Sequence, residues 1–265
     1  MSERSTLSVD RVRQLGQGDA HLDADPTYAR LVMRRISPAI TYLVVRYTGL
    51  SADAVTALAI ACGIAGGLLA APGTLATNLA AVTLLQLAYL LDVADGEVAR
   101  VRRTAGKRGT YLDLIGHVVQ NRALYGGATF SLVLVSGYAW WAIVIAMLGV
   151  AFASAFGEQS RAQVLGGGAT SSPHGARSAA DDPMPPSLGA RIYWLYRQAR
   201  FAWNYPASMN LFCIALLADA ARFAVDSTAT ALVLPAFAGA FAVTLAAKQM
   251  VNALRLLRRD LWAAP

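Results

Sequence analysis

Long uncharged stretches alternate with short polar segments along the chain. Residues 54–91 contain no Asp, Glu, Lys or Arg. A helix needs about 20 residues to cross a bilayer, so a run of this length accommodates two spans. Pro72 and Gly73 interrupt the run near its middle, where proline and glycine favour a turn over a continuous helix. The pattern predicts two membrane-spanning helices joined by a short turn.

Three more uncharged runs follow. Residues 123–157 repeat the pattern, with an interruption near their middle, and predict a third and a fourth helix. Residues 201–218 and 227–247 predict a fifth and a sixth helix. We therefore expect an all-α integral membrane protein with six transmembrane helices, in a domain that covers residues 49–260.

Residues 26–48 have the pattern of a helix that lies in the membrane interface. Apolar residues recur there at three- and four-residue spacing beside a face of arginines, as in an amphipathic helix. Residues 1–25 are polar and contain no apolar signal-peptide core, so we expect a flexible segment. Residues 166–188 are rich in Gly, Ser, Ala and Pro, which predicts a flexible loop.

Composition and charge agree with a membrane protein. Hydrophobic residues make up 56% of the chain and charged residues 15%, with a mean hydropathy of +0.44, whereas soluble domains are about 25% charged. The net charge of +7 comes from residues at the edges of apolar segments, so membrane lipids or an anionic substrate explain it better than nucleic acid. Cys62 and Cys213 lie in apolar segments without metal-binding spacing and predict buried side chains.

The distribution of Lys and Arg predicts the orientation. All but two of the 23 basic residues precede the first span, follow the sixth, or lie in the loops after the second and fourth spans. The exceptions are Arg122, within a span, and Arg222, in an opposite loop. Because basic loops stay in the cytoplasm, we expect a multi-pass inner (cytoplasmic) membrane protein with both termini cytoplasmic.

The acids of residues 54–157 gather near the cytoplasmic end of the second span and the start of the third. They are Asp92, Asp95, Glu97 and Asp113. Ionisable groups at membrane depth are costly, so they suggest a functional site. The alternative is a structural role, in which acids at a helix end pair with the neighbouring arginines.

The spacing of these groups favours a site. Asp92 and Asp95 stand three residues apart on one helical face, and Asp113 and His117 stand four apart on the next helix, with Asn121 on the same stripe. Two facing helices of this kind predict a divalent-cation site made by the three aspartates and the imidazole. Carboxylates suit Mg²⁺ or Mn²⁺, and a phosphate-bearing substrate commonly completes the shell.

Small residues near the acids leave room for a ligand. Gly96, Ala99 and Gly109 would let a nucleotide or pyrophosphate approach the backbone closely. Arg100 could offer paired donors to a phosphate group.

The order of these residues resembles the signature of the CDP-alcohol phosphotransferases, D-x2-D-G-x2-A-R-x8-12-G-x3-D-x3-D. Seven of the eight fixed positions match: Asp92, Asp95, Gly96, Ala99, Arg100, Gly109 and Asp113. His117 occupies the position of the fourth Asp, to which the family assigns general-base duty and a share in a second metal. The segment from Leu50 to Thr56 and Arg161-Ala-Gln163 resemble further family motifs more weakly.

The resemblance implies a reaction. An acceptor hydroxyl attacks the β-phosphorus of a CDP-linked alcohol, a phosphodiester forms, and CMP leaves, in phospholipid or related lipid biosynthesis. Asp92, Asp95, Asp113 and His117 would hold Mg²⁺ or Mn²⁺, and His117 and Asp113 would be catalytic. The CDP-binding residues would be Asp92, Gly96, Ala99, Arg100, Gly109 and Thr56. The family also implies a homodimer.

His117 leaves three alternatives open. As a base it is well suited, because an unperturbed imidazole titrates near pH 6.5. As a metal ligand it would replace an anionic oxygen by a neutral nitrogen and shift preference towards Mn²⁺ or another transition ion. The third alternative is a family member that binds a CDP-alcohol and metal without the usual turnover.

Three polar residues are candidates for binding the acceptor. Arg122, Arg161 and Asn121 could hold an anionic acceptor such as a phosphorylated polyol, or the arginines could anchor the helices at the interface.

The alternative to an enzyme is an ion-coupled transporter, which would spread polar groups through several spans. The acids gather at one depth instead, which favours the enzyme.

Overall fold

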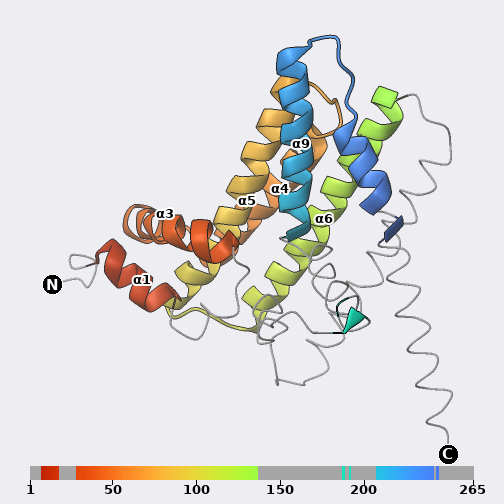
Figure 1. The fold of residues 1–265 in the computed structure, drawn as a ribbon. Helices are drawn as coiled ribbons and strands as arrows, with labels where there is room; N and C mark the ends of the chain where they lie inside the picture. The colour runs from red at the N-terminus through yellow and green to blue at the C-terminus, as the bar shows by residue number, and fades with distance from the viewer. Residues whose placement is uncertain are drawn as a thin grey trace, which may run out of the picture.

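The computed structural model describes residues 7–17, 28–136, 187, 188, 191, 207–241, 243 and 244, and this part of the chain contains helices and no strands (Figure 1). Its long helices are α4 (Ala52–Leu69), α5 (Leu75–Val101), α6 (Lys107–Ser136) and α9 (Ala207–Val225). Shorter helical segments are α1 (Val9–Gln17), the π-helical turn η2 (Ala29–Met33), α3 (Arg34–Tyr47) and residues 233–241.

Helix α5 is the centre of the arrangement. It contacts α1, α3, α4 and α9, and α4 also contacts α6. Helices α4, α5, α6 and α9 run alongside one another, whereas α1 and α3 lie across the end of this bundle where α5 ends and α6 begins (Figure 1). The end of α5 that carries signature residues therefore lies beside α1 and α3.

Within the described residues, three helices are long and apolar enough to cross a membrane: Ala52–Leu69, Leu75–Val101 and Ser208–Val225. Helix α6 has 30 residues, but its first turns carry charged groups. The predicted fourth span and nearly all of the predicted loop at 166–188 lie outside the described residues. The count of six spans stays a prediction.

The predicted break between the first two spans is confirmed. Gly73 adopts a φ of 63°, which favours glycine, and Thr74 then caps the start of α5. The Thr74 hydroxyl accepts the amide of Thr77 at 3.3 Å, and the Thr77 hydroxyl accepts the amide of Thr74 at 3.1 Å. These bonds satisfy two of the donors that a helix start leaves unpaired.

Glycines allow α4 and α6 to approach backbone to backbone. A Cβ atom added at Gly127 would lie 1.7 Å from the carbonyl oxygen of Gly67, and one added at Gly67 would lie 2.5 Å from the carbonyl carbon of Ala123. One turn away, a Cβ at Gly63 would meet Oε1 of Gln120 at 2.3 Å. Small residues at such interfaces let membrane helices pack closely.

An apolar core joins α5 and α6 to α9 and residues 233–241. Phe212 is fully buried, and its ring contacts the rings of Tyr125, Phe237 and Phe241 at centroid distances of 5.0–5.6 Å. Leu85 of α5 belongs to the same cluster. This packing fixes α6 relative to the central helix.

Asp219 ties α9 to the helix that follows it. Its carboxylate is fully buried and accepts the amides of Leu232, Val233 and Leu234 at 2.8–3.0 Å. Arg222 donates to the same carboxylate at 3.2 Å. The aspartate therefore caps the helix that begins at 233 from a different helix.

The N-terminal segment differs from the flexible stretch expected over residues 1–25. Val9–Gln17 is a helix, and its Val12 is fully buried. Contacts with α3 and α5, which are distant in sequence, provide the order that the local pattern does not indicate. Residues 29–47 are helical within the predicted segment 26–48, and the location of that segment in the interface stays a prediction.

Candidate functional site

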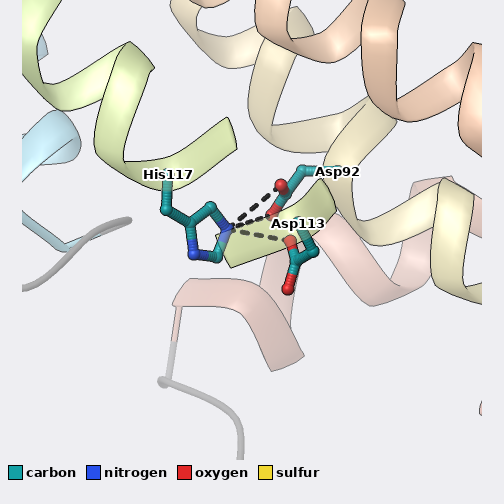
Figure 2. Close-up of side chains that lie close together, drawn as sticks. All are labelled: Asp92, Asp113 and His117. Carbon is teal, nitrogen blue, oxygen red and sulfur yellow. Dashed lines mark hydrogen bonds and ion pairs between the residues drawn. The ribbon is translucent and has the colours of Figure 1, made fainter. Parts of the chain in front are cut away.

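Three of the four predicted metal ligands come together between α5 and α6 (Figure 2). Nε2 of His117 lies 3.1 Å from Oδ1 and 3.2 Å from Oδ2 of Asp92, and 3.2 Å from Oδ1 of Asp113. One ligand atom from each side chain lies within 4.8 Å of the others. Asp92 comes from α5, and the other two come from successive turns of α6.

This group has the dimensions of a divalent-cation site. An octahedral ion bound at about 2.1 Å holds adjacent ligand atoms about 3.0 Å apart. The distances of 3.1–3.2 Å between the imidazole nitrogen and the carboxylate oxygens are those of hydrogen bonds and ion pairs, and they are also compatible with such a shell. The side chains of Asp92, His117 and Asp113 are 13%, 21% and 44% exposed, so the group opens on the side of Asp113.

The fourth predicted ligand, Asp95, is not in this group of three. It is buried, and its Oδ2 accepts a hydrogen bond of 2.6 Å from the hydroxyl of Thr56 on α4. Thr56, predicted to bind CDP, is itself buried and also contacts the carbonyl of Ala52 at 3.1 Å. The threonine therefore orients the carboxylate of Asp95.

The remaining signature residues lie along α5 and at the start of α6. Gly96 lies under the guanidinium of Arg100, because a Cβ there would come within 3.2 Å of Nη1. The Ala99 carbonyl accepts the Thr104 amide at 2.8 Å. At Gly109 an added Cβ would meet nothing within 4 Å. Of these positions, Gly109 is the one that faces open space.

Residues 50–172 match the family model of the CDP-alcohol phosphatidyltransferases. This segment is a CDP-alcohol phosphatidyltransferase domain. The match contains α4, α5 and α6, and with them every signature position from Asp92 to His117. No curated protein matches the chain.

The match of residues 50–172 supports a transferase role in the membrane. The family transfers phospho-alcohol groups from CDP-alcohol donors to hydroxyl acceptors in lipid biosynthesis, and it uses a divalent metal. The group formed by Asp92, Asp113 and His117 is the candidate place for that metal in the transferase domain.

The predicted acceptor residues of the transferase domain have different surroundings. Oδ1 of Asn121 accepts a hydrogen bond of 3.3 Å from the hydroxyl of Ser208, which joins α6 to α9. Arg122 is half-buried on α6. Arg161 lies outside the described residues. Asn121 and Arg122 both follow His117 on α6, one to two turns further along the helix.

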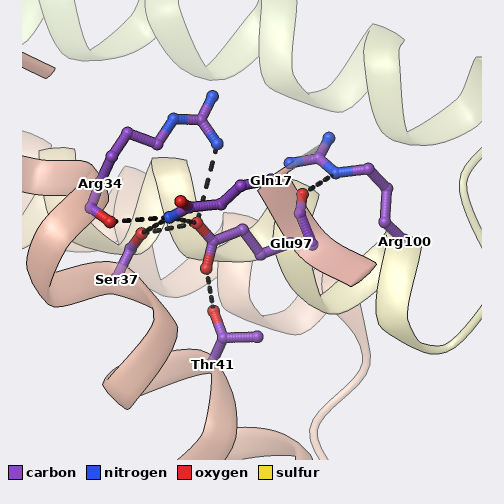
Figure 3. Close-up of polar contacts among 7 residues, drawn as sticks. Gln17, Arg34, Ser37, Thr41, Glu97 and Arg100 are labelled. Atoms are coloured by element: carbon purple, nitrogen blue, oxygen red, sulfur yellow. Dashed lines mark hydrogen bonds and ion pairs between the residues drawn. The ribbon is translucent and has the colours of Figure 1, made fainter. Parts of the chain in front are cut away.

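Glu97 belongs to the acidic cluster of the sequence but is not among the predicted ligands, and it is fully buried in the transferase domain. Its carboxylate accepts the hydroxyls of Ser37 at 2.6 Å and Thr41 at 2.7 Å, and Arg34 forms an ion pair at 3.7 Å (Figure 3). These partners all belong to α3 and precede the transferase domain in the sequence. No local pattern around Glu97 indicates them.

Proposed function

We propose that this protein moves a phospho-alcohol group, of phosphatidyl type, from a CDP-alcohol donor to an acceptor hydroxyl and releases CMP. The observation that carries the proposal is the group of Asp92, Asp113 and His117, which α5 and α6 bring together inside the family domain. The site would lie at the cytoplasmic face of the inner membrane, as the distribution of basic residues predicts.

Asp92, Asp113 and Nε2 of His117 would hold the divalent ion. Bound there, Mg²⁺ or Mn²⁺ would stabilise the negative charge of the pyrophosphate and of the departing CMP. Asp95, oriented by Thr56, lies one turn from Asp92 on α5 and would support the same site. The imidazole in this set favours Mn²⁺ more than a fourth carboxylate would.

Arg100 would bind the phosphates of the donor. Asp92, Gly96 and Arg100 follow one another at four-residue spacing and so share one stripe of α5. The guanidinium lies over Gly96, between its own backbone position and that of Asp92. A pyrophosphate between the metal ligands and Arg100 would meet two positive centres, and the open space at Gly109 would admit the nucleotide.

Asp113 would receive the proton of the acceptor hydroxyl, and His117 would take that role instead where its Nε2 does not bind the ion. Asp113 is the most exposed of the three ligands, so an acceptor can reach it. The contact of 3.2 Å between Asp113 and Nε2 fixes the imidazole beside it. Removal of the proton strengthens the hydroxyl as a nucleophile towards the β-phosphorus.

The acceptor is proposed to carry an anionic group, as a phosphorylated polyol or glycerol phosphate does. Arg122 and Asn121, one to two turns beyond His117 on α6, support this proposal, with Arg161 as the third predicted contact. Arginine matches the geometry of phosphate. A homodimer is proposed from the family alone.

CMP release tests the function. Purified protein would be incubated with CDP-diacylglycerol, Mg²⁺ or Mn²⁺, and a panel of glycerol phosphate and phosphorylated inositols. We expect CMP only when donor, metal and a competent acceptor are all present. Metal-dependent binding of CDP-diacylglycerol without CMP release would contradict the enzyme and support a binding role, and ion transport without nucleotide cleavage would support a transporter.

A further inference from the structure

The C-terminal end of α1 rests on the buried carboxylate of Glu97 (Figure 3). Nε2 of Gln17, the last residue of α1, lies 2.9 Å from Oε1 of Glu97 and 2.8 Å from the carbonyl oxygen of Arg34. The Gln17 amide therefore joins α1 to α5 and α3 at one point. Gln17 is only 5% exposed, so this contact is shielded from water.

Close packing at the preceding residue adds to this contact. Gly16 is buried, and an added Cβ there would lie 3.1 Å from Cβ of Glu97. The backbone of α1 therefore rests directly on the Glu97 side chain. A larger residue at position 16 would have to displace either the helix or the glutamate.

Gly16 also contacts Arg100. The Gly16 carbonyl oxygen accepts a hydrogen bond from Nε of Arg100, which stands three residues after Glu97 on α5 (Figure 3). A bond at Nε fixes the plane in which the guanidinium lies. Glu97 and Gln17 thus hold the backbone carbonyl that orients the signature arginine.

We propose that Glu97 and Gln17 are positioning residues for Arg100: they seat α1 on α5 so that the Gly16 carbonyl holds the guanidinium over Gly96, ready for the donor's phosphates. This inference rests on the proposed function, in which Arg100 binds those phosphates. A guanidinium held in place loses less conformational freedom when it binds. The N-terminal helix, outside the family domain, would then tune affinity for the donor.

The test compares two glutamines of α1. Gln17→Ala removes the bond to Glu97, whereas Gln14→Ala removes an exposed side chain that contacts Arg11 at 3.3 Å. We expect Gln17→Ala to raise the KM for CDP-diacylglycerol about tenfold, as the loss of a supporting contact commonly does, and to change kcat and the KM for the acceptor much less. Gln14→Ala should leave all three constants at the wild-type values.

A double-mutant cycle with Arg100→Ala decides whether Gln17 acts through the arginine. If it does, Gln17→Ala adds little to the donor KM of Arg100→Ala, because two residues that act as a unit are not additive. Gln17→Met keeps the side-chain volume but lacks the amide donor. It replaces Gln17→Ala in the same measurement if the alanine variant unfolds. Glu97→Gln, which has the same shape and no charge, should also raise the donor KM.

The measurements distinguish failure of the positioning role from failure of the proposed function. If the wild-type protein releases CMP but Gln17→Ala and Gln17→Met keep the wild-type donor KM, the positioning role is wrong and the proposed function stands. Full additivity with Arg100→Ala, or an equal rise in donor and acceptor KM, would also overturn it. If the wild-type protein releases no CMP with any donor, the proposed function fails and this inference fails with it.

Discussion

The carbonyl oxygen of Gly67 lies 1.7 Å from the position that a Cβ atom at residue 127 would occupy, so Gly67 and Gly127 lock α4 against α6. Helix α4 also packs against α5. The distance between Asp92 on α5 and the Asp113–His117 pair on α6 therefore depends on a contact between two glycines that carry no chemistry.

Gly127→Ala is expected to destabilise the protein by about 1–3 kcal/mol, because the new methyl group forces the two backbones apart. Thermal unfolding in detergent measures the loss. Gly126→Ala is the matched control, since an added Cβ there meets nothing within 4 Å. Equal melting temperatures for the two variants would show that the helices are not packed in this way.

Neutralising the proposed metal ligands should remove turnover without unfolding the chain. For Asp92→Asn and Asp113→Asn we expect kcat to fall by about 100-fold or more, because each variant loses an anionic ligand at a charged centre. Asp95→Asn should reduce kcat strongly as well. CMP release measures the rate, and gel filtration in detergent monitors the fold. Near-native rates in all three variants would place the metal elsewhere.

His117→Asp introduces the aspartate that the resemblance to the signature implies at this position. Because a carboxylate replaces a neutral nitrogen, we expect the ratio of activity with Mg²⁺ to activity with Mn²⁺ to rise on the order of tenfold. Chelation should abolish activity in both proteins. An unchanged metal preference would argue against His117 as a ligand, and complete loss of activity would indicate that the site suits a different acceptor.

Gly109→Ala tests whether the bound donor lies against the backbone at Gly109. The position faces open space, so the variant should unfold at the wild-type temperature. If the nucleotide lies against the backbone there, the methyl group should raise the donor KM about tenfold and leave acceptor binding unchanged. A donor KM equal to that of the wild type would exclude close approach at Gly109.

Asp219→Ala should lower stability, because it leaves three amides near the start of the helix at 233 without their acceptor. A buried polar group that loses its partner costs about 1–3 kcal/mol. Asp226→Ala, in the exposed turn between the two helices, is the control. Thermal unfolding that does not distinguish the two variants would contradict the cap.

Patterns that are local in the sequence were sufficient to predict several helices and most of the cluster formed by Asp92, Asp113 and His117. Pro72 and Gly73 mark the turn between α4 and α5, and spacing on one helical face places Asp113 beside His117. Which residues share one face of a helix depends on helix geometry alone. The contact of Asp92 with His117 required one further assumption, that the two helices face each other.

Contacts between distant segments could not be predicted in this way. Thr56 and Asp95 are 39 residues apart, and Gln17 and Glu97 are 80 apart. Each pair forms only after helices have packed, and neither partner has a spacing that indicates the other. Gln17 lies in a polar segment whose composition favours a flexible chain, so its order comes from packing on α3 and α5.

The cap made by Asp219 has a consequence for membrane insertion. If α9 entered the bilayer alone, its carboxylate would reach the hydrocarbon without the three amides that it accepts in the folded protein. Entry together with the next helix avoids that cost. The translocon is therefore expected to release this pair into lipid as a single helical hairpin, and truncation after residue 226 should leave α9 poorly inserted.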